Sequence, residues 1–286
     1  MAQLQFGVLI FPDATVQEIA GRVVVAEDLG FDRAVFPDHI NDPRGGNSTW
    51  HDSWAVLASA ASATSRIRIG MLVANPILRP PAVLAKQAIT IDHLSAGRLD
   101  MGLGTGIFAF DHHAVGSRHW GRAERMQRFA EYVAIVDGVM RAAGTTFAHQ
   151  GDWLSTAGVV TAPAPIQRPR PPLVIGGQSA PVLRLAATYA DTWNTHGPTG
   201  IDFEELLVLT ARQNRLLDDL CHRAGRDPAT VTRALTMFGA VDPWRTRRSF
   251  DEVVDRFAGV GISEFVLHWP PPERFDELQA IADRIA

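Results

Sequence analysis

The sequence predicts a (β/α)8 TIM barrel, and three observations support this fold. Eight short apolar segments, in the pattern of buried parallel strands, alternate with helical segments along the 286 residues. A helix between two successive strands makes them parallel, because only such a crossover returns the chain to the same edge of a sheet. The first turn, residues 11–14, contains no glycine, whereas a doubly wound dinucleotide fold carries its glycine fingerprint there.

The expected strands are short runs rich in branched and aromatic side chains. In chain order they are residues 4–10, 31–36, 66–73, 99–103, 173–175, 192–194, a stretch within 231–241, and 263–268. An insertion separates the fourth strand and its helix from the fifth strand. Residues 144–172 lack a helical period and are rich in proline, so we expect extended chain or a small hairpin there, within one domain spanning 1–286.

Apolar residues that recur every three or four positions predict the helices. Thr15 and Glu18 have the spacing of a capping box at the start of the first helix, and Ser249 and Glu252 have the same spacing at the seventh. The expected helices are residues 15–30, 52–63, 81–95, 122–143, 179–189, 203–224, 249–259 and 270–286.

Composition excludes several classes of function. A formal net charge of −4 argues against non-specific binding to nucleic acid or to an anionic membrane. The single cysteine, Cys221, rules out an internal disulfide and a cysteine-based metal cluster. The N-terminal sequence MAQLQFGVLIF lacks a basic region and a cleavage site, and no apolar run reaches about 18 residues. We therefore expect a cytoplasmic protein whose partner is a small-molecule substrate.

In a barrel of this kind the chemistry lies where strands end and loops begin. Asp38 and His39 follow the second strand, where a carboxylate beside an imidazole can handle a proton. A histidine at a strand end can equally be a hydrogen-bonded loop residue. No metal site is expected, because the first strand has no His-x-His motif and His112-His113 has no matching partner motif.

Two glycine-rich turns at strand ends are candidate ligand sites. After the fifth strand, glycine N–H groups precede a helix N-terminus, which favours a phosphate, and the next loop would face the same group. These residues are Gly176, Gly177, Gln178, Ser179, Thr195, His196 and Gly197. The run Gly104, Thr105, Gly106 lacks the further glycine of a dinucleotide fingerprint, so it is also explained as a tight turn.

Aromatic and histidine side chains crowd the loops at the same end. They suit a planar ring ligand and an apolar substrate, although a satellite hydrophobic cluster under long loops is the alternative. The candidates for this pocket are Trp50, His51, Phe108 and Phe110, together with His268 at the end of the last strand.

Taken together, these segments resemble the luciferase-like monooxygenase family. The resemblance lies in AEDLGFDRAVFPDHI (26–40), TSRIRIG (64–70), PPAVLAKQAITIDHLSAGRLDMGLGTG (80–106), PPLVIGGQS (171–179) and LRLAATYADTWN (183–194), in this order and spacing. It implies a (β/α)8 barrel that binds FMN or the deazaflavin coenzyme F420.

The resemblance also implies roles for particular residues. A flavin-type ring would lie over the barrel mouth, backed by a bulge after the third strand that often contains a non-prolyl cis peptide, here at Leu72–Val73 or its neighbour. His39 would donate or accept a proton, oriented by Asp38. Further contacts with the coenzyme would come from Leu72, Val73, Ala74 and Asn75, from Gly104, Thr105 and Gly106, and from the phosphate grip of Gly176, Gly177 and the following turn.

The compact chain resembles the F420-dependent branch, which implies hydride transfer to or from an organic substrate. An FMN-dependent monooxygenase supplied by a separate reductase is the alternative, and a non-catalytic flavin- or partner-binding barrel is a third. Residues 107–110 lack the acidic residue that sugar-phosphate dehydrogenases of this family carry close to this point, which favours a small apolar substrate. Family members often dimerise through the second and third helices, so residues 52–63 are the expected interface of a homodimer.

Overall fold

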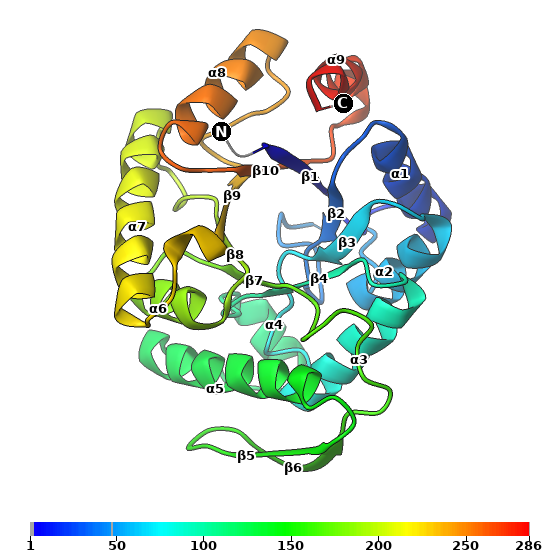
Figure 1. The fold of residues 1–286 in the computed structure, drawn as a ribbon. Helices are drawn as coiled ribbons and strands as arrows, with labels where there is room; N and C mark the ends of the chain where they lie inside the picture. The colour runs from blue at the N-terminus through cyan, green and yellow to red at the C-terminus, as the bar shows by residue number, and fades with distance from the viewer. Residues whose placement is uncertain (1–2, 47, 286) are drawn as a thin grey trace.

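The computed structural model describes residues 3–46 and 48–285, within which eight parallel strands close into a barrel (Figure 1). Each barrel strand pairs with the barrel strands that precede and follow it in the chain, and β10 closes the ring against β1. This confirms the predicted (β/α)8 fold. The barrel strands are β1 (Gln5–Leu9), β2 (Arg33–Phe36), β3 (Arg68–Met71), β4 (Leu99–Leu103), β7 (Leu173–Gly176), β8 (Thr192–Thr195), β9 (Thr232–Met237) and β10 (Glu264–His268).

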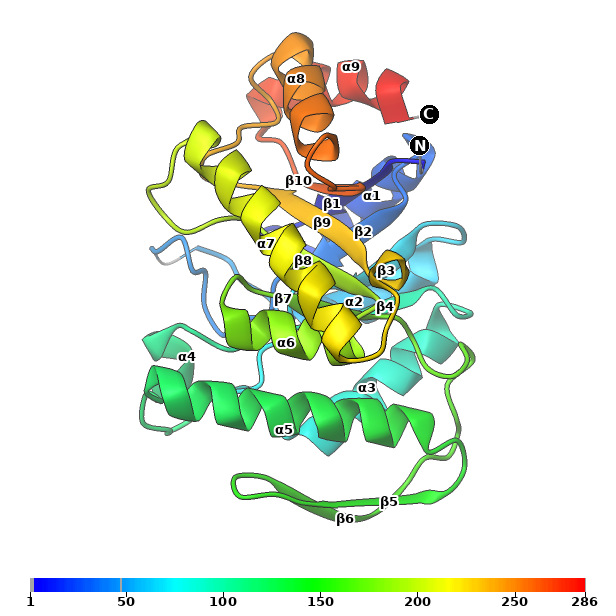
Figure 2. The same ribbon diagram turned by 60° about the vertical axis from the view of Figure 1, so that its left-hand side comes forward.

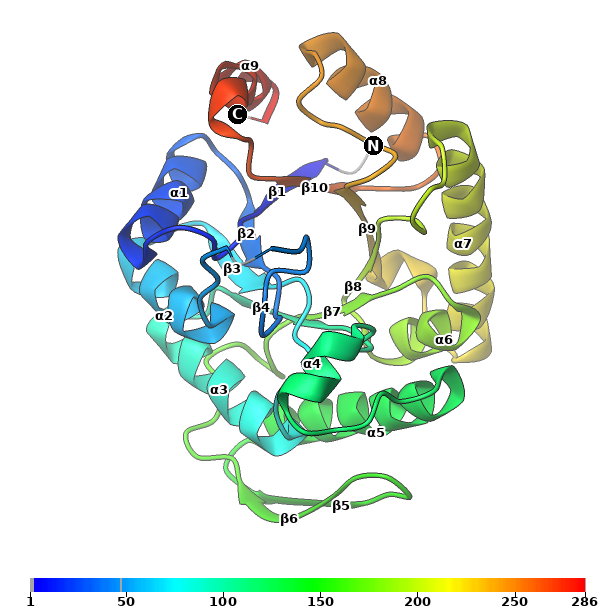
Figure 3. The same ribbon diagram turned by 180° about the vertical axis from the view of Figure 1, so that it is seen from behind.

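Helices surround the barrel as an outer layer (Figures 1 and 2), and one short helix, α4 (Ala109–Ala114), folds over an end of the barrel (Figure 3). They are α1 (Val16–Asp28), α2 (Ser53–Ala63), α3 (Pro81–Leu94), α4 (Ala109–Ala114), α5 (Arg122–Arg141), α6 (Ala180–Tyr189), α7 (Phe203–Arg223), α8 (Arg247–Ala258) and α9 (Phe275–Ile285). The short helix α4 was not predicted, because six residues are too few for a helical period to stand out. No helix among the described residues has both the length and the apolar character needed to cross a membrane.

The helix starts test the predicted capping boxes. The Thr15–Glu18 box is present at the start of α1. The box predicted at Ser249 and Glu252 is wrong by three residues. Thr246 caps α8 instead, and its hydroxyl accepts a hydrogen bond of 3.1 Å from the backbone N–H of Ser249. The earlier start adds a turn, which the ion pair between Arg247 and Asp251 (3.1 Å) spans.

The expected insertion contains a small hairpin. Strands β5 (Thr146–Gln150) and β6 (Ser155–Val160) pair antiparallel and lie outside α5, away from the barrel (Figure 2). The Glu131 carboxylate of α5 accepts hydrogen bonds from the backbone N–H groups of Asp152, Trp153 and Leu154. These bonds fasten the hairpin turn to the outer helix.

The main hydrophobic core fills the space between strands and helices, and a smaller cluster lies in the barrel interior. Leu9, Val35 and Val266 form this cluster, with Phe11 and Leu72 packed against them. These five residues come from β1, β2, β10 and the segments just after β1 and β3, so they form a floor beneath the mouth of the barrel.

Charged side chains occupy the opposite, N-terminal end of the barrel. Arg33 pairs with Glu264 (3.1 Å) and with Asp100 (3.5 Å), and Arg68 pairs with Asp100 at 2.6 Å. Glu264 is 2% exposed, and this burial raises the pKa of its carboxyl to about 7 against the pull of Arg33. The N-terminal end of the barrel is therefore closed by an ionic network, and the apolar cluster lies between this network and the mouth.

Candidate active site

The centre of the candidate site is His39, which follows β2 at the C-terminal end of the barrel. Its Nδ1 atom lies 2.8 Å from Oδ2 of Asp111, and Asp111 is completely buried on α4. The same carboxylate accepts hydrogen bonds from the backbone N–H of Ile40 (2.9 Å) and from the Asn75 amide (2.8 Å). An ionised carboxylate only accepts, so the proton of a neutral His39 sits on Nδ1. Nε2 then carries a lone pair for a ligand.

The predicted orienting role of Asp38 is wrong. Its Oδ2 atom accepts a hydrogen bond of 2.9 Å from the backbone N–H of Asn75 and a charge-assisted hydrogen bond from the Arg79 guanidinium. Burial raises the pKa of the Asp38 carboxyl, and Arg79 and the Asn75 N–H oppose that shift. Asp38 therefore anchors the loop after β3, while Asp111 orients His39.

Sequence reasoning missed Asp111 because it lies 72 positions after His39. The available signal was an acidic residue only five positions beyond the Gly104–Gly106 turn. It falls just past the segment 107–110, which contains no acidic residue. Figure 3 shows why the two meet, since α4 folds over the barrel next to the loop that follows β2.

Three of the predicted pocket aromatics surround His39. The Phe108 ring stands edge-on to the imidazole, with centroids 5.0 Å apart and planes at 86°, and Phe110 lies at 5.9 Å. The Trp50 indole N–H donates a hydrogen bond of 2.9 Å to the backbone carbonyl of His39. The neighbouring His51 is held through its backbone, because its N–H donates a hydrogen bond to the carbonyl of Pro12. The wall beside the imidazole is therefore mainly apolar.

His268 lies elsewhere on the rim, at the end of β10. Its Nε2 atom accepts the indole N–H of Trp244 at 3.1 Å, so its proton is on Nδ1, which faces the carbonyl of Met237 at 3.3 Å. Burial lowers the pKa of His268. This histidine shapes a hollow of about 300 Å³ beside Phe238 and Trp244. Its place in a substrate pocket stays a prediction, and both of its ring nitrogens are already engaged.

The segment after β3 forms the predicted bulge, and the Leu72–Val73 peptide bond is cis. A Cβ atom on Gly104 would lie 2.2 Å from a Val73 methyl, and one on Gly176 would lie 2.9 Å from the other methyl. Val73 therefore requires glycine at both positions. The backbone continues the ladder, since the Ala74 N–H bonds to the carbonyl of Gly102 and the Gly104 N–H bonds to the carbonyl of Ala74. Contacts of this bulge with a coenzyme stay a prediction.

The turns next to the bulge are also tightly packed. Gly106 has a φ of +66°, and a Cβ atom there would lie 2.8 Å from Oδ1 of Asn75. The Asn75 side chain thus passes under the turn of Gly104, Thr105 and Gly106 to reach Asp111. Asn75 links the two buried carboxylates, because its backbone N–H bonds to Asp38 and its side-chain amide bonds to Asp111.

The turn after β7 departs in part from the predicted phosphate grip, because the N–H of Gly177 bonds to the carbonyl of Asn194 at 3.1 Å. Ser179 is the N-cap of α6, and within the described residues its side chain makes no capping hydrogen bond to the first turn. Gly177 has a φ of +138°. The neighbouring Thr195 is buried, and its hydroxyl oxygen has no partner among the described residues. A ligand with acceptor oxygens would satisfy both groups. In the same loop His196 is exposed and Gly197 is buried.

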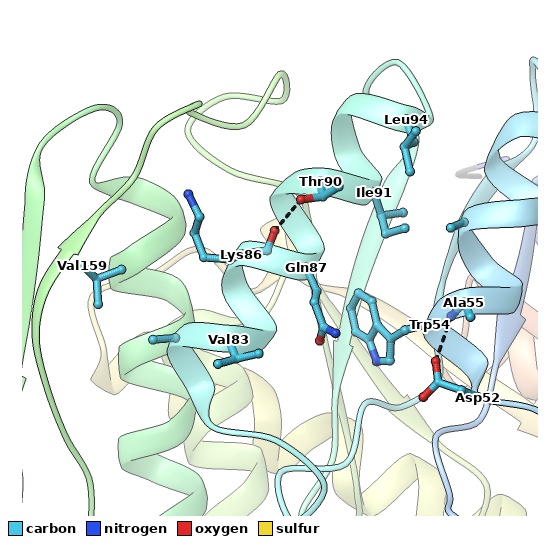
Figure 4. Close-up of a pocket in the computed structure, with 12 residues that line it drawn as sticks. Asp52, Trp54, Ala55, Val83, Lys86, Gln87, Thr90, Ile91, Leu94 and Val159 are labelled. Atoms are coloured by element: carbon cyan, nitrogen blue, oxygen red, sulfur yellow. Dashed lines mark hydrogen bonds between the residues drawn. The ribbon is translucent and has the colours of Figure 1, made fainter.

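Other features of the described residues place limits on the site. No group of three or more His, Cys, Asp or Glu side chains among them is arranged to hold a metal ion. A groove of about 730 Å³ lies on the outer helical layer rather than at the mouth, between α2 and α3 (Figure 4). Trp54, Val83 and Ile91 line it, and Val159 of β6 borders it.

Comparison with known proteins agrees with this architecture. An uncharacterized protein of Mycobacterium tuberculosis strain H37Rv is 28% identical, and the match covers 99% of this chain and 98% of the relative. An F420-dependent secondary alcohol dehydrogenase in complex with an F420–acetone adduct superposes with a TM-score of 0.84, at 17% identity over 98% of both chains.

Two further solved structures show the same fold. The coenzyme F420-dependent tetrahydromethanopterin reductase from Methanopyrus kandleri has a TM-score of 0.78 at 17% identity, with 98% of each chain covered. The oxygenating constituent of 3,6-diketocamphane monooxygenase from Pseudomonas putida, in complex with FMN, has a TM-score of 0.75 at 14% identity, with 99% of this chain and 98% of that chain covered.

The model of the luciferase-like monooxygenase family matches residues 4–271. That range includes every barrel strand, the bulge after β3, His39 and Asp111. The chain therefore belongs to the luciferase-like monooxygenase family.

Proposed function

We propose that the protein is an oxidoreductase that uses F420 for hydride transfer to or from a small, mainly apolar organic substrate. One observation supports this most directly: His39 is held by a buried carboxylate through Nδ1, which leaves Nε2 for proton exchange with a substrate. The close fold similarity to an F420-dependent secondary alcohol dehydrogenase supports the choice of coenzyme.

A bound deazaflavin supplies hydride exchange at its ring carbon. In the oxidising direction, His39 Nε2 would accept the hydroxyl proton of an alcohol, and the oxidised coenzyme would be the acceptor of the carbon-bound hydrogen as hydride. In the reducing direction, the same nitrogen returns a proton to the carbonyl oxygen. Asp111 keeps the imidazole in the required tautomer and stabilises its positive charge after proton uptake.

The remaining roles concern binding. Thr195 and the first turn of α6 would hold the phosphate that both F420 and FMN carry. Leu72 and Val73 would support the ring from below. Phe108 and Phe110 beside His39 favour an apolar substrate and exclude water from the proton-transfer step.

Titration of the protein with each coenzyme tests the proposal. We expect F420 to bind more tightly than FMN, and we expect small secondary alcohols to bleach the visible absorbance of bound F420. Tighter binding of FMN would contradict the proposal and favour a monooxygenase supplied by a reductase. Failure to bind either coenzyme would favour a non-catalytic barrel.

A further inference from the structure

The turn between β7 and α6 is held by two side chains, one from the barrel strand β8 and one from the outer helix α7. The Trp193 indole N–H donates a hydrogen bond of 2.8 Å to the carbonyl of Gly177. The Gln213 side-chain amide donates a hydrogen bond of 3.0 Å to the carbonyl of Gln178. Trp193 is completely buried and Gln213 is 5% exposed. Both carbonyl groups therefore point into the protein, towards β8 and α7.

The direction of these carbonyls determines where the next N–H groups point. Neither peptide bond is among the cis bonds of the described chain, and in a trans peptide the C=O and N–H groups point in opposite directions. The N–H groups of Gln178 and Ser179 therefore point away from Trp193 and Gln213. They stand at the N-terminus of α6, where partial positive charge attracts an anion.

A glutamine at position 213 destabilises the fold in one respect. Its Oε1 atom is buried and has no hydrogen-bond partner among the residues that the structure describes. A buried polar atom without a partner destabilises the folded state, and an apolar side chain of the same length would avoid that cost. The hydrogen bond that its Nε2 atom donates to the Gln178 carbonyl gives a reason for an amide at this position.

We propose that Gln213 is a positioning residue for coenzyme binding. By holding the Gln178 carbonyl inward, it keeps the Ser179 N–H directed at the phosphate of the coenzyme, and Trp193 does the same for the Gln178 N–H. This inference rests on the proposed function, which places that phosphate at α6. It goes further by assigning a role to residues of β8 and α7 that touch no ligand themselves.

The test uses Gln213→Met, which keeps the length of the side chain and removes the donor. Trp193→Phe removes the other donor and keeps an aromatic ring. Thr210→Val is the matched control: Thr210 lies one turn earlier on α7, is fully buried, and also has a hydroxyl without a partner among the described residues. Within the described part of the chain, no hydrogen bond joins its hydroxyl to the turn. Circular dichroism and thermal melting establish that each variant is folded.

The readout is the dissociation constant for coenzymes with and without the phosphate. The pairs are F420 with its phosphate-free deazariboflavin core, and FMN with riboflavin. We expect Gln213→Met to weaken binding of the phosphate-bearing member about tenfold, the order of one lost charge-assisted hydrogen bond, and to leave the phosphate-free member unchanged. Trp193→Phe should act in the same direction, and Thr210→Val should bind both members as the parent protein does.

Two results would overturn the inference. Equal weakening of both members of a pair would show a general structural defect, and unchanged binding of both would show that Gln213 has no positioning role. If the parent protein binds neither coenzyme, the proposed function fails separately. A titration with inorganic phosphate then decides the inference, since the Ser179 amide resonance should shift in the parent protein and stay unmoved in Gln213→Met. An unmoved resonance in the parent protein would also overturn it.

Discussion

At the scale of single residues, the contact that organises the site joins His39 to Asp111. The carboxylate is completely buried and collects three donors, from the imidazole, from Asn75 and from the backbone of Ile40. Three donors compensate for its loss of hydration. The arrangement fixes the His39 tautomer before any ligand arrives, which is what proton transfer at Nε2 requires.

Asp111→Asn tests this role. An asparagine can present an N–H to His39 and so place the proton on Nε2, where it blocks acceptance of a substrate proton. We expect kcat to fall by about 10²–10⁴-fold, as for the loss of a comparable orienting carboxylate. Steady-state kinetics measures the loss, and the dissociation constant for the coenzyme should stay within about twofold.

His113→Asn is the control for that substitution, because His113 lies on the same short helix and is exposed. It should retain the parent kcat. His39→Ala should lose turnover to a similar extent as Asp111→Asn while still binding coenzyme. A fully active Asp111→Asn enzyme would exclude the proposed role of the carboxylate.

Glu264 supplies a second prediction at this scale. Its pKa is about 7 in the folded protein, above the ordinary value of 4.5, because it is buried. Between these two pKa values the folded state binds the proton and the unfolded state has lost it, so stability falls as the pH rises from about 5 to 7. The shift corresponds to at most about 3 kcal/mol.

Glu264→Gln should remove this contribution. Urea unfolding at pH 5 and at pH 7.5 gives the change in the free energy of unfolding with pH. The contribution of Glu264 is the difference in this change between the parent protein and the variant. Glu273→Gln, at an exposed position, should show the same change in the free energy of unfolding with pH as the parent protein. If the free energy of unfolding of Glu264→Gln changed with pH as it does in the parent protein, the raised pKa of Glu264 would be refuted.

At the scale of elements, helix starts show how local signals compete. Both Thr246 and Ser249 can cap a helix, and both are followed three residues later by a polar side chain. The chain uses Thr246, so Arg247 and Asp251 can pair within α8. Phe250, which is fully buried, lies in the first turns of this helix and packs against the core.

Two substitutions test whether Thr246 or Ser249 caps α8. Thr246→Ala removes the cap and should lower the free energy of unfolding by about 1 kcal/mol. Glu252→Ala, at the position first expected to close the box, should change it by less than about 0.5 kcal/mol. Chemical denaturation distinguishes the two, and a larger effect at Glu252 would return the helix start to Ser249.

At the scale of the whole molecule, the outer groove between α2 and α3 is a feature that the active site does not use (Figure 4). Helix α2 carries no charged residue, and Val83 and Leu94 on α3 are 48% and 49% exposed. Small alanines beside them allow a helix to approach closely. We propose that a second copy of the chain covers this groove in a symmetric dimer.

Val83→Lys should break such a dimer without disturbing the fold, because the side chain is already half exposed. Val208→Lys is the matched control, since Val208 is 68% exposed on α7, outside the groove. Size-exclusion chromatography with light scattering should give a dimer for the parent protein and for Val208→Lys, and a monomer for Val83→Lys. A monomeric parent protein, or dimeric Val83→Lys, would contradict this interface.

Much of the fold and part of the site follow from local patterns in the sequence. Strand and helix periodicities repeat at short range, so eight alternating units and the Thr15 cap are predictable from neighbouring residues alone. The position of His39 after β2 places it at the mouth once the barrel is recognised. A cis bond at Leu72–Val73 or its neighbour was expected from family resemblance, and the structure has it at Leu72–Val73.

The pairing of the buried side chains depends on the tertiary structure. Asp38 is adjacent to His39 in the chain, yet it turns to Arg79 and Asn75, and the partner of His39 comes from α4. Being adjacent in a loop does not make two side chains meet, whereas residues far apart in the chain converge when strand ends close into a ring. The sequence by itself therefore determined the barrel and the position of its histidine. Only the closed barrel decided which carboxylate that histidine contacts.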